Sequence, residues 1–309
     1  IVELAKAHTK KILKCEAIIP DLETALICRS KSATYYKFKG ILNTPEIFPN
    51  VGSIPHYPVF LKPNIGQGSK GTSIAYTNEE VLGALKKNPG LLILEYLPGD
   101  EFTIDCFTDR KGALLFVGSR QRVRTVNGIS VSSKPVANKA FQKYATFINK
   151  NLNLRGAWFF QMKYNSTGEL SLLEIAPRIA GTMALYRNLG VNFPLLTLFD
   201  RKDLDVKVST NKLKIELDRA LITRFKSNLR YSKVYVDLDD CLLINNEVNW
   251  YLLGFLYQAL NYHKKLILIT MHKNDLQTTL KQYRLSGLFD EIIHLTKDQD
   301  KATFIDPMD

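Results

Sequence analysis

The sequence predicts two domains of different class, an α+β domain followed by an α/β domain. In the first, short strands follow one another with tight turns between them, as in LILEYL, EFTIDCF and ALLFVG, an order typical of antiparallel hairpins. In the second, the strands VYVDLD, KLILIT and EIIHL alternate with helical segments, which is typical of a parallel sheet with crossover helices. A polar, charge-rich segment that follows neither pattern separates them.

The domain boundaries are expected where these patterns change. The first domain is expected at 1–200, a linker at 201–231 and the second domain at 232–309. The chain begins at Ile1 rather than at a methionine, and it stops at Asp309 inside what reads as an unfinished domain. We therefore expect a fragment that lacks part of an N-terminal subdomain and the end of the C-terminal domain.

The remaining elements follow from apolar periodicity and from the residues that start and end helices. Asn78 suits the start of one helix, Gly40 suits the end of another, and 109–112 suits a turn between strands. The helices are expected at 3–17, 30–40, 78–87, 136–151, 247–262 and 274–285. Strands are expected at 58–62, 72–76, 91–97, 101–107, 113–118, 157–164 and 169–175.

Composition narrows the classes of protein and ligand. The 42 Lys and Arg exceed the 30 Asp and Glu by 12, which favours anionic ligands. No block of five basic residues occurs, and a phosphorylated small molecule fits the charge as well as nucleic acid does, so nucleic acid is not among the expected partners. No apolar run approaches the roughly 18 residues of a membrane helix, so no membrane contact is expected. The four scattered cysteines indicate reduced thiols in a cytoplasmic protein, without a zinc site or disulfide framework.

The segment FLKPNIGQGSKGTSI is the first candidate for a phosphate site. Lys62 ends a strand and is followed by a glycine-rich turn. Glycines let backbone N–H groups approach phosphate oxygens closely, and a lysine adds a positive charge. The spacing does not match a Walker A loop. Taken alone, the segment also suits an ordinary surface hairpin turn.

Two further segments, LILEYLPGDEFTID and GAWFFQMKYNSTGELSLLEIAPRIAGT, follow in order. Together with the glycine-rich segment they resemble the ATP-grasp superfamily, particularly its carbamoyl-phosphate-synthetase-like branch, over about residues 20–195. This resemblance implies an α+β fold and a Mg²⁺-dependent ligase that uses ATP to convert a carboxylate into an acyl phosphate. An amine then attacks the acyl phosphate, so small-molecule carboxylate and amine substrates are expected.

The resemblance also implies roles for individual residues. ATP would be bound by Lys31, Lys62, Gly66, Gly68, Ser69, Gly71, Glu95, Leu97 and Glu101. Magnesium would be bound by Gln161 and Glu174, and the anionic substrate or phosphoryl group by Arg120, Arg122 and Arg178. One position departs from the family, because Ala176 stands where its metal-binding Asn is expected. Alanine has no side-chain oxygen for Mg²⁺, so ATP binding is a firmer expectation than turnover.

The segment VYVDLDDCLL places two carboxylates, Asp237 and Asp239, at the end of a strand. Such a pair is costly unless a cation neutralises it, so a Mg²⁺ site is expected there. The segment resembles the first motif of haloacid-dehalogenase-like (HAD) phosphatases, although Cys241 stands where Thr is usual. The resemblance implies a Rossmann-like α/β fold, with one aspartate as nucleophile and the other as general acid/base. The alternative is a polar strand end followed by a turn.

Thr270, at the end of the strand LILIT, matches the second motif of this family, whose hydroxyl holds the phosphoryl group. Lys301 is a better match for the lysine of the third motif than Lys297. The acidic fourth motif is expected beyond the end of the chain, because Asp306 follows Lys301 too closely for an intervening helix and strand.

The leading hypothesis is therefore an ATP-grasp ligase joined to a HAD-like phosphatase that acts on a phosphorylated metabolite. A second hypothesis makes phosphatase chemistry the main activity and the ATP-grasp half a nucleotide-binding, non-catalytic module; Ala176 favours it. A third, a degenerate scaffold or nucleic-acid binder, rests on the positive charge alone. A homo-oligomer is compatible with each of the three.

Overall fold

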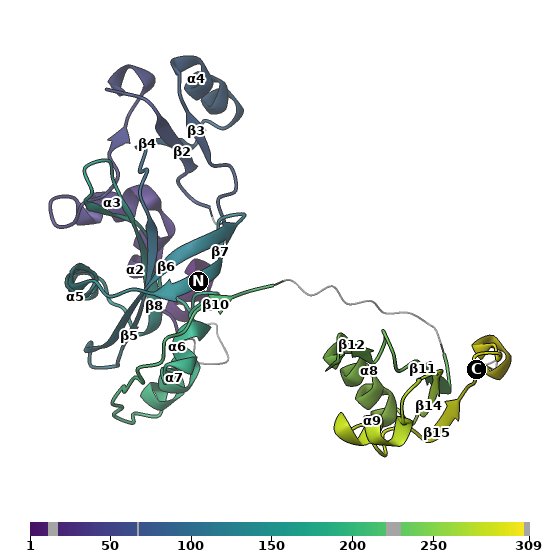
Figure 1. Cartoon of the computed structure of the whole chain (residues 1–309). Coiled ribbons are helices and arrows are strands. Elements are labelled where there is room, and N and C mark those ends of the chain that lie inside the picture. Colours follow the sequence, from purple (N-terminus) through teal and green to yellow (C-terminus); the bar gives the residue numbers. More distant parts are fainter. Residues whose placement is uncertain (12–17, 67, 221–229, 306–309) are drawn as a thin grey trace. The chain divides into compact units, whose positions relative to one another are not determined.

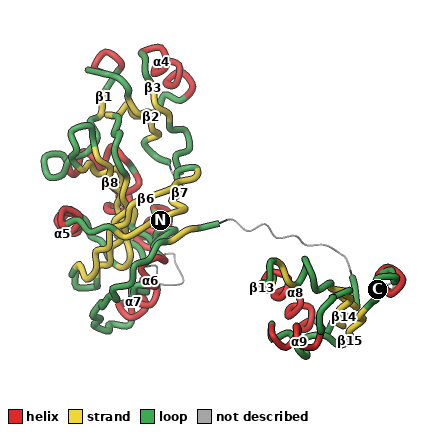
Figure 2. The backbone as a smooth tube through the Cα atoms, viewed as in Figure 1, coloured by secondary structure: helices red, strands yellow, loops and turns green. Residues whose placement is uncertain are grey.

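The computed structural model describes all residues except 12–17, 67, 221–229 and 306–309. The chain forms two compact units, Ile1–Leu221 and Ile222–Asp309. Each unit is considered by itself below, with the labels of Figure 1. The first unit combines two antiparallel sheets with several helices, whereas the second has helices beside a small parallel sheet (Figure 2). Among the described residues, no helix is both long and apolar enough to cross a membrane.

A six-stranded antiparallel sheet forms the centre of the first unit, in the order β10-β7-β6-β5-β8-β9. Its strands are β5 (Glu101–Thr108), β6 (Leu114–Val126), β7 (Ile129–Pro135), β8 (Gly156–Tyr164), β9 (Leu170–Ala176) and β10 (Leu217–Asp218). The expected hairpins at 101–118 and 157–175 are present. Strand β6 is longer than expected and β7 was not expected, because both are rich in Ser, Arg and Lys rather than apolar residues.

Successive side chains of β8 point alternately into the main core and to the opposite face of the sheet. Trp158, Phe160 and Met162 are fully buried in the main core. Helix α5 (Lys139–Asn151) adds Phe141 and other apolar residues to the same core. Because successive side chains of a strand point to opposite faces, Gln161 lies on the face away from this core. The sequence of β8 therefore determines which of its side chains can reach a ligand.

A smaller antiparallel sheet, of order β1-β4-β2-β3, is the second sheet of the first unit. Its strands are β1 (Ile47–Phe48), β2 (Val59–Pro63), β3 (Ser73–Ala75) and β4 (Leu91–Glu95), with the short helix η1 (Val51–Ser53) nearby. Helix α4 (Asn78–Lys87) packs on the sheet and is capped by Thr77, one residue before the Asn expected at its start. The glycine-rich segment connects β2 to β3.

Further helices in the described part of the first unit are α1 (Val2–Thr9), α2 (Leu22–Arg29), α3 (Lys31–Phe38), α6 (Ala184–Asn188) and α7 (Phe193–Arg201). The end of the expected helix 3–17 lies outside the described residues. Helix α2 occupies a segment where no helix was expected, and Asp21 caps it by accepting from the backbone N–H of Thr24. Ser30 separates α2 from α3 and caps α3.

The boundary between the units differs from the expected one. Residues 201–231 were predicted to be a linker, yet β10 adds to the large sheet beside β7. Val208, Ile215 and Leu217 also pack against the apolar cluster around α6 and α7. The first unit therefore reaches Leu221 rather than residue 200. The sequence did not predict a strand in this segment because its composition is polar. An edge strand buries only a few of its side chains, so it needs few apolar residues.

The second unit contains a three-stranded parallel sheet of order β11-β14-β15. Its strands are β11 (Lys233–Val236), β14 (Lys265–Thr270) and β15 (Glu291–His294). Helices α8 (Trp250–Asn261) and α9 (Leu276–Gln282) follow the first two strands, and a short hairpin, β12 (Leu243–Ile244) with β13 (Glu247–Val248), precedes α8. The 3₁₀-helix η2 (Lys301–Phe304) comes last. The parallel pairing expected from the β–α alternation is confirmed.

Candidate functional site

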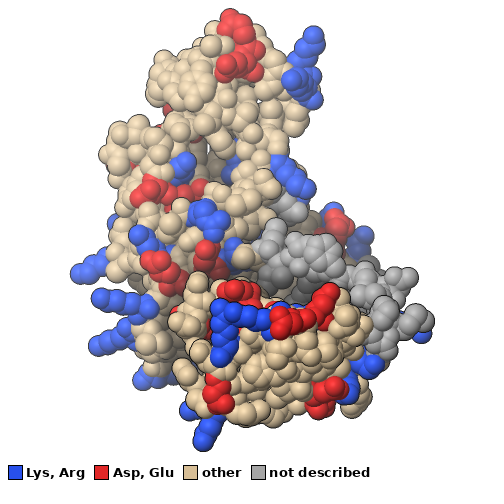
Figure 3. Space-filling model, turned by 45° about the vertical axis from the view of Figure 1, so that its right-hand side comes forward, with Lys and Arg blue, Asp and Glu red and all other residues tan. Residues whose placement is uncertain are grey.

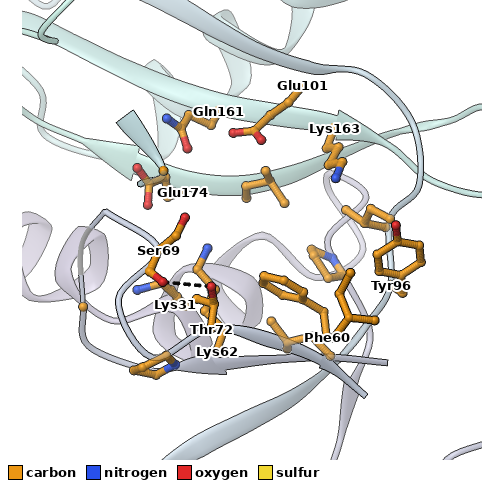
Figure 4. Close-up of a pocket in the computed structure, with 18 of the residues that line it drawn as sticks. Lys31, Phe60, Lys62, Ser69, Thr72, Tyr96, Glu101, Gln161, Lys163 and Glu174 are labelled. Carbon is orange, nitrogen blue, oxygen red and sulfur yellow. Dashed lines mark hydrogen bonds between the residues drawn. The ribbon is translucent and has the colours of Figure 1, made fainter. Parts of the chain in front are cut away.

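A cavity of about 310 Å³ lies between the two sheets of the first unit. Figure 4 shows Lys62, Phe60 and Thr72 on the small sheet and its connecting turn facing Glu101, Gln161 and Glu174 on the large one. The cavity is also lined by most of the residues that the sequence predicts to bind ATP: Lys31, Lys62, Gly66, Gly68, Ser69, Glu95, Leu97 and Glu101. Gly71 does not line it, but its neighbours Lys70 and Thr72 do.

Two lysines bring positive charge into this cavity from different elements. Lys62 lies on β2, and burial lowers its pKa, although Glu174 and Glu101 partly offset that effect. Lys31 is the first residue of α3, and its Nζ donates to the backbone oxygen of Asn64 over 3.3 Å. Burial, and then the charge of Lys62, lower the pKa of Lys31 to about 8. Both lysines therefore lack the anionic surroundings that would fully stabilise their charge.

The charges that line the cavity fit an anionic ligand. Lys70, Arg122 and Lys163 add to the two lysines, against three carboxylates, Glu95, Glu101 and Glu174. The glycine-rich turn lies beside the lysines, and its Gly68 and Gly71 have positive φ angles of 61° and 72°. Backbone N–H groups in such turns form concavities that bind phosphate. A nucleotide polyphosphate is therefore a suitable ligand for this part of the cavity.

Gln161 and Glu174, the predicted magnesium ligands, lie directly opposite each other on β8 and β9. One orientation of the Gln161 amide satisfies both neighbours: its nitrogen donates to Glu174 Oε1 over 3.2 Å and its oxygen accepts from Arg122 Nη1 over 2.8 Å. Ala176 follows on β9 without an oxygen ligand. Nowhere in the described parts of the chain do three His, Cys, Asp or Glu side chains cluster as a metal site. Magnesium commonly binds one or two carboxylates plus substrate phosphates, so Glu174 fits such an ion.

Arg120 and Arg122, the two predicted substrate-binding arginines of β6, have different surroundings. Arg122 forms an ion pair with Glu101 and donates from Nη2 to the backbone oxygen of Gly128 over 2.7 Å. Arg120 is 1% exposed, and its Nε lies 2.7 Å from Oδ2 of Asp105, which is fully buried. Burial raises the pKa of Asp105, while Arg120 acts in the opposite direction. Both predicted substrate-binding arginines are thus held in position by carboxylates of β5.

The hairpin between β6 and β7 contacts the glycine-rich turn, a contact that the sequence did not indicate. Asn127 and Gly128 form the hairpin tip with φ angles of 49° and 71°. A Cβ atom added to Gly128 would lie 2.1 Å from Ser69 Oγ and 2.8 Å from the backbone carbon of Gly68. The tip therefore packs against the turn at a distance that only glycine permits. The only sequence signal was the Asn-Gly pair itself, which is typical of hairpin turns.

The connection after β4 forms another wall of the cavity. The backbone N–H of Glu95 donates to the Glu46 carbonyl over 2.9 Å, and a Glu95 carboxylate oxygen accepts from the Glu46 N–H over 3.3 Å. Tyr96 and the buried Leu97 line the cavity beside Phe60. These apolar surfaces suit a planar base. The sequence predicted Glu95 and Leu97 here but not Phe60, Tyr96 or Lys163.

A second cavity of about 830 Å³ adjoins the first and shares Lys31, Arg122, Gln161 and Glu174 with it. Arg120 and the exposed Arg178 line this second cavity. The Arg178 guanidinium carbon lies 5.1 Å from the centre of the Phe159 ring, a cation–π distance. The three predicted substrate-binding arginines therefore gather around one space, next to the predicted metal ligands.

In the second unit, the predicted phosphatase residues meet at the carboxyl ends of β11 and β14. The Nζ of Lys301 contacts Asp237 Oδ2 in an ion pair. Asp239 lies 2.9 Å from Nδ1 of His272, a residue that the sequence did not single out. Nε2 of His272 is 2.9 Å from the hydroxyl of Thr279. Thr270 is fully buried, and its Oγ1 accepts from the backbone N–H of His272 over 3.2 Å.

Comparison with known proteins supports the prediction for the first unit. The family described as "ATP-grasp in the biosynthetic pathway with Ter operon" matches residues 87–223. The first unit has the ATP-grasp fold. The biotin carboxylase domain of Hydrogenobacter thermophilus 2-oxoglutarate carboxylase, in complex with MgADP, ADP and bicarbonate, matches with a TM-score of 0.58. It is 17% identical, and the match covers 68% of this chain and 52% of that chain.

Another solved structure, N5-carboxyaminoimidazole ribonucleotide synthetase from Thermus thermophilus, is 20% identical with a TM-score of 0.54. That match covers 68% of this chain and 61% of the synthetase. At these identities the similarity of both solved structures to this chain shows the fold alone.

Two curated proteins are similar in sequence. The L-arginine-specific L-amino acid ligase of Bacillus subtilis is 28% identical over 191 residues, 52% of this chain and 46% of the ligase. The arginine-specific large chain of carbamoyl phosphate synthase from Halalkalibacterium halodurans is 26% identical over 157 residues, 46% of this chain and 14% of the synthase. The chain thus spans less than half the length of either relative.

We expect Gly128→Ala to weaken nucleotide binding at least about tenfold, because the new Cβ would push Ser69 and Gly68 out of place. The measurement is a calorimetric titration with Mg²⁺ and a slowly hydrolysed ATP analogue. Gly112→Ala is the matched control, since Gly112 also has a positive φ, 78°, but has nothing within 4 Å of an added Cβ. Equal affinities in the two variants would contradict the proposed contact.

We expect nucleotide binding to take up protons near pH 8. Burial lowers the pKa of Lys31 to about 8 in the free protein, so about half of its amine is neutral there. Phosphate groups favour the ammonium form and raise this pKa, so uptake declines as the pH falls below that value. Calorimetry in buffers of different ionisation enthalpy measures the uptake. Lys31→Arg, which stays charged, should reduce it, whereas a wild-type protein without uptake would refute the prediction.

Proposed function

We propose that the first unit is an ATP- and Mg²⁺-dependent ligase that activates a carboxylate as an acyl phosphate for attack by an amine. The observation that carries this proposal is the connection between the two cavities. Lys31, Arg122, Gln161 and Glu174 line both of them, so a phosphate in the first cavity would lie next to an acid in the second. The ligase activity named for one of the two bacterial relatives, the L-amino acid ligase, supports the same reaction class.

In this reaction, Lys31 and Lys62 hold the polyphosphate while the glycine-rich turn covers it. Magnesium bound by Glu174, with Gln161 beside it, would neutralise charge on the transferred phosphoryl group. A carboxylate oxygen of the substrate forms a bond to the γ-phosphorus, and the bond from that phosphorus to the bridging oxygen breaks, so that ADP leaves. Catalysis of such a transfer consists mainly of positioning and charge stabilisation.

The amine then attacks the acyl carbon, and inorganic phosphate leaves as the new amide forms and the amine loses a proton. Arg178, in the second cavity, is suitably placed to neutralise the leaving phosphate. Ala176 reduces the number of protein oxygen ligands, so the ion would depend more on phosphate and water. The metal ion at this site would therefore be held largely by the phosphates of the bound nucleotide.

The test combines binding with turnover. Lys62→Ala should weaken the ATP analogue at least tenfold, or about 1.4 kcal/mol, because the variant loses a positive charge beside the phosphates. Lys86→Ala, on the exposed side of α4, is the control. ADP release that requires an added carboxylic acid, with hydroxylamine trapping the acyl phosphate as a hydroxamate, would support ligation. Analogue binding without acid-dependent ADP release would favour the non-catalytic nucleotide module instead.

We propose phosphatase activity as a second function, for the unit Ile222–Asp309, because a basic side chain contacts each member of its aspartate pair. The ion pair of Lys301 with Asp237 and the contact of His272 with Asp239 support it. Asp237 would attack the phosphorus of a phosphorylated metabolite, and the departing ester oxygen would take a proton from Asp239. Water then hydrolyses the aspartyl phosphate. Mg²⁺ bound by the two carboxylates would stabilise the transferred charge, and Thr270 would bind a phosphoryl oxygen.

We expect Asp237→Asn to abolish hydrolysis of p-nitrophenyl phosphate by the full chain, because an amide is a poor nucleophile. Asp240→Asn is the matched control, because Asp240 is the next residue after Asp239. Asn also tolerates the positive φ of 57° at this position. Activity that survives Asp237→Asn, or is lost equally in both variants, would remove the phosphatase proposal. The activity of the first unit would be unaffected by either result.

Nucleic acid binding lacks comparable support. On the face shown in Figure 3, Lys and Arg side chains are interspersed with Asp and Glu side chains rather than forming one continuous basic surface. The excess of 12 positive charges instead includes the cations that line the two cavities. A phosphorylated metabolite as a substrate and a homo-oligomeric assembly remain predictions from the sequence.

A further inference from the structure

The second cavity of the first unit carries more positive charge than a single carboxylate requires. Its lining includes six basic side chains, Arg29, Lys31, Arg120, Arg122, Arg178 and Arg219. The acidic side chains are two, Glu3 and Glu174. With about 830 Å³ of space, the cavity can also hold a larger acid than acetate or bicarbonate.

Ion pairs account for only part of this charge. Arg120 and Arg122 are matched by Asp105 and Glu101. In the described portion of the chain, by contrast, Arg29, Arg178 and Arg219 have no carboxylate within ion-pair distance. Arg29 donates to the Gly66 carbonyl, over 3.4 Å, and Arg178 to the Ile179 carbonyl, over 3.1 Å. Guanidinium groups without a carboxylate, gathered around one cavity, indicate an anionic ligand.

Arg219 is held where it can reach this ligand. The pairing of β10 with β7 fixes its backbone, and its N–H donates to the Val131 carbonyl over 2.7 Å. Its guanidinium passes over Gly181, because a Cβ added there would lie 2.9 Å from Nη1 of Arg219. Gly181 also lines the cavity. The side chain thus lies against the cavity wall formed by the loop after β9.

Lys31, Arg122 and Glu174 line the part that the second cavity shares with the first, where the phosphoryl group is transferred under the proposed function. Arg219 lines only the second cavity. Apolar side chains, including Leu26, Phe159 and Ile175, complete the wall and suit a carbon chain. The substrate's reacting carboxylate and a second charged group would therefore meet different cations.

We propose that the acid activated by this protein carries a second anionic group, a carboxylate or a phosphate, which Arg219 binds. This proposal rests on the ligase function proposed above and specifies its substrate class as a dianionic carboxylic acid. Arginine suits the role because its planar fork donates two parallel hydrogen bonds to either anion. A monoanionic acid would leave Arg219 without a partner and would bind more weakly.

The test compares acids that differ by one charged group. Glutarate with its monoamide, and 3-phosphoglycerate with glycerate, are titrated calorimetrically into the full chain saturated with Mg²⁺ and a slowly hydrolysed ATP analogue. We expect at least one dianion to bind tenfold or more tightly than its monoanionic partner. Preference within the first pair identifies a carboxylate as the second group, and preference within the second pair identifies a phosphate.

Arg219→Ala should reduce the preferred dianion's affinity to that of its monoanionic partner. Arg124→Ala is the matched control, because Arg124 is an exposed arginine that pairs with Asp218 next to Arg219 but lines neither cavity. It should keep the full preference. Both variants change exposed side chains, and thermal unfolding checks that each remains folded.

Two results would overturn the proposal: no preference for either dianion, or a preference that survives Arg219→Ala. After either result, the ligase function still stands if the ATP analogue binds and a monoanionic acid stimulates ADP release from ATP. Only the second anion site is then lost. If the analogue itself does not bind to the folded chain, the ligase function fails first. The two failures are therefore distinguishable.

Discussion

The burial of Lys62 and Lys31 between two sheets is the constraint on which the rest of the first unit depends. Burial disfavours the charged form of both amines, and it lowers the pKa of Lys31 to about 8. Glu174 and Glu101 on the large sheet offset part of this cost. The remaining cost makes the cavity a site that gains stability when an anion enters it. The position of the two sheets is thereby linked to ligand binding.

Strands β5 and β6 distribute the other charges around this cavity. Asp105 holds Arg120 and Glu101 holds Arg122, so neither arginine is free to turn toward the lysines. Arg122 in turn reaches Gly128 at the hairpin tip, which lies against the glycine-rich turn. The β6–β7 hairpin therefore supports both the glycine-rich turn beside the first cavity and one wall of the second cavity. The geometry explains why β6 is rich in polar residues from Ser119 onward.

In the second unit, the charged groups that have partners at the candidate site are two aspartates rather than lysines and arginines. Its aspartates follow a strand of a parallel sheet, and each has a basic side chain beside it, Lys301 for Asp237 and His272 for Asp239. The ion pair with Lys301 offsets the charge of Asp237, and His272 contacts Asp239 through Nδ1. In both units, charged groups at strand ends or on strand faces are held by partners from distant parts of the chain.

The sequence by itself indicated the two hairpins at 101–118 and 157–175, the change from antiparallel to parallel pairing, and most of the charged residues that line the first cavity. These depend on local signals: apolar periodicity, glycine turns and motif spacing. Only the tertiary structure decided the partners of Arg120 and Arg122, the contact of Gly128 with Ser69, the positions of His272 and Arg219, and the inclusion of 201–220 in the first unit. Each of these depends on which strands are neighbours. Pairing between distant strands is selected by packing and charge across the whole fold, and no local pattern records it.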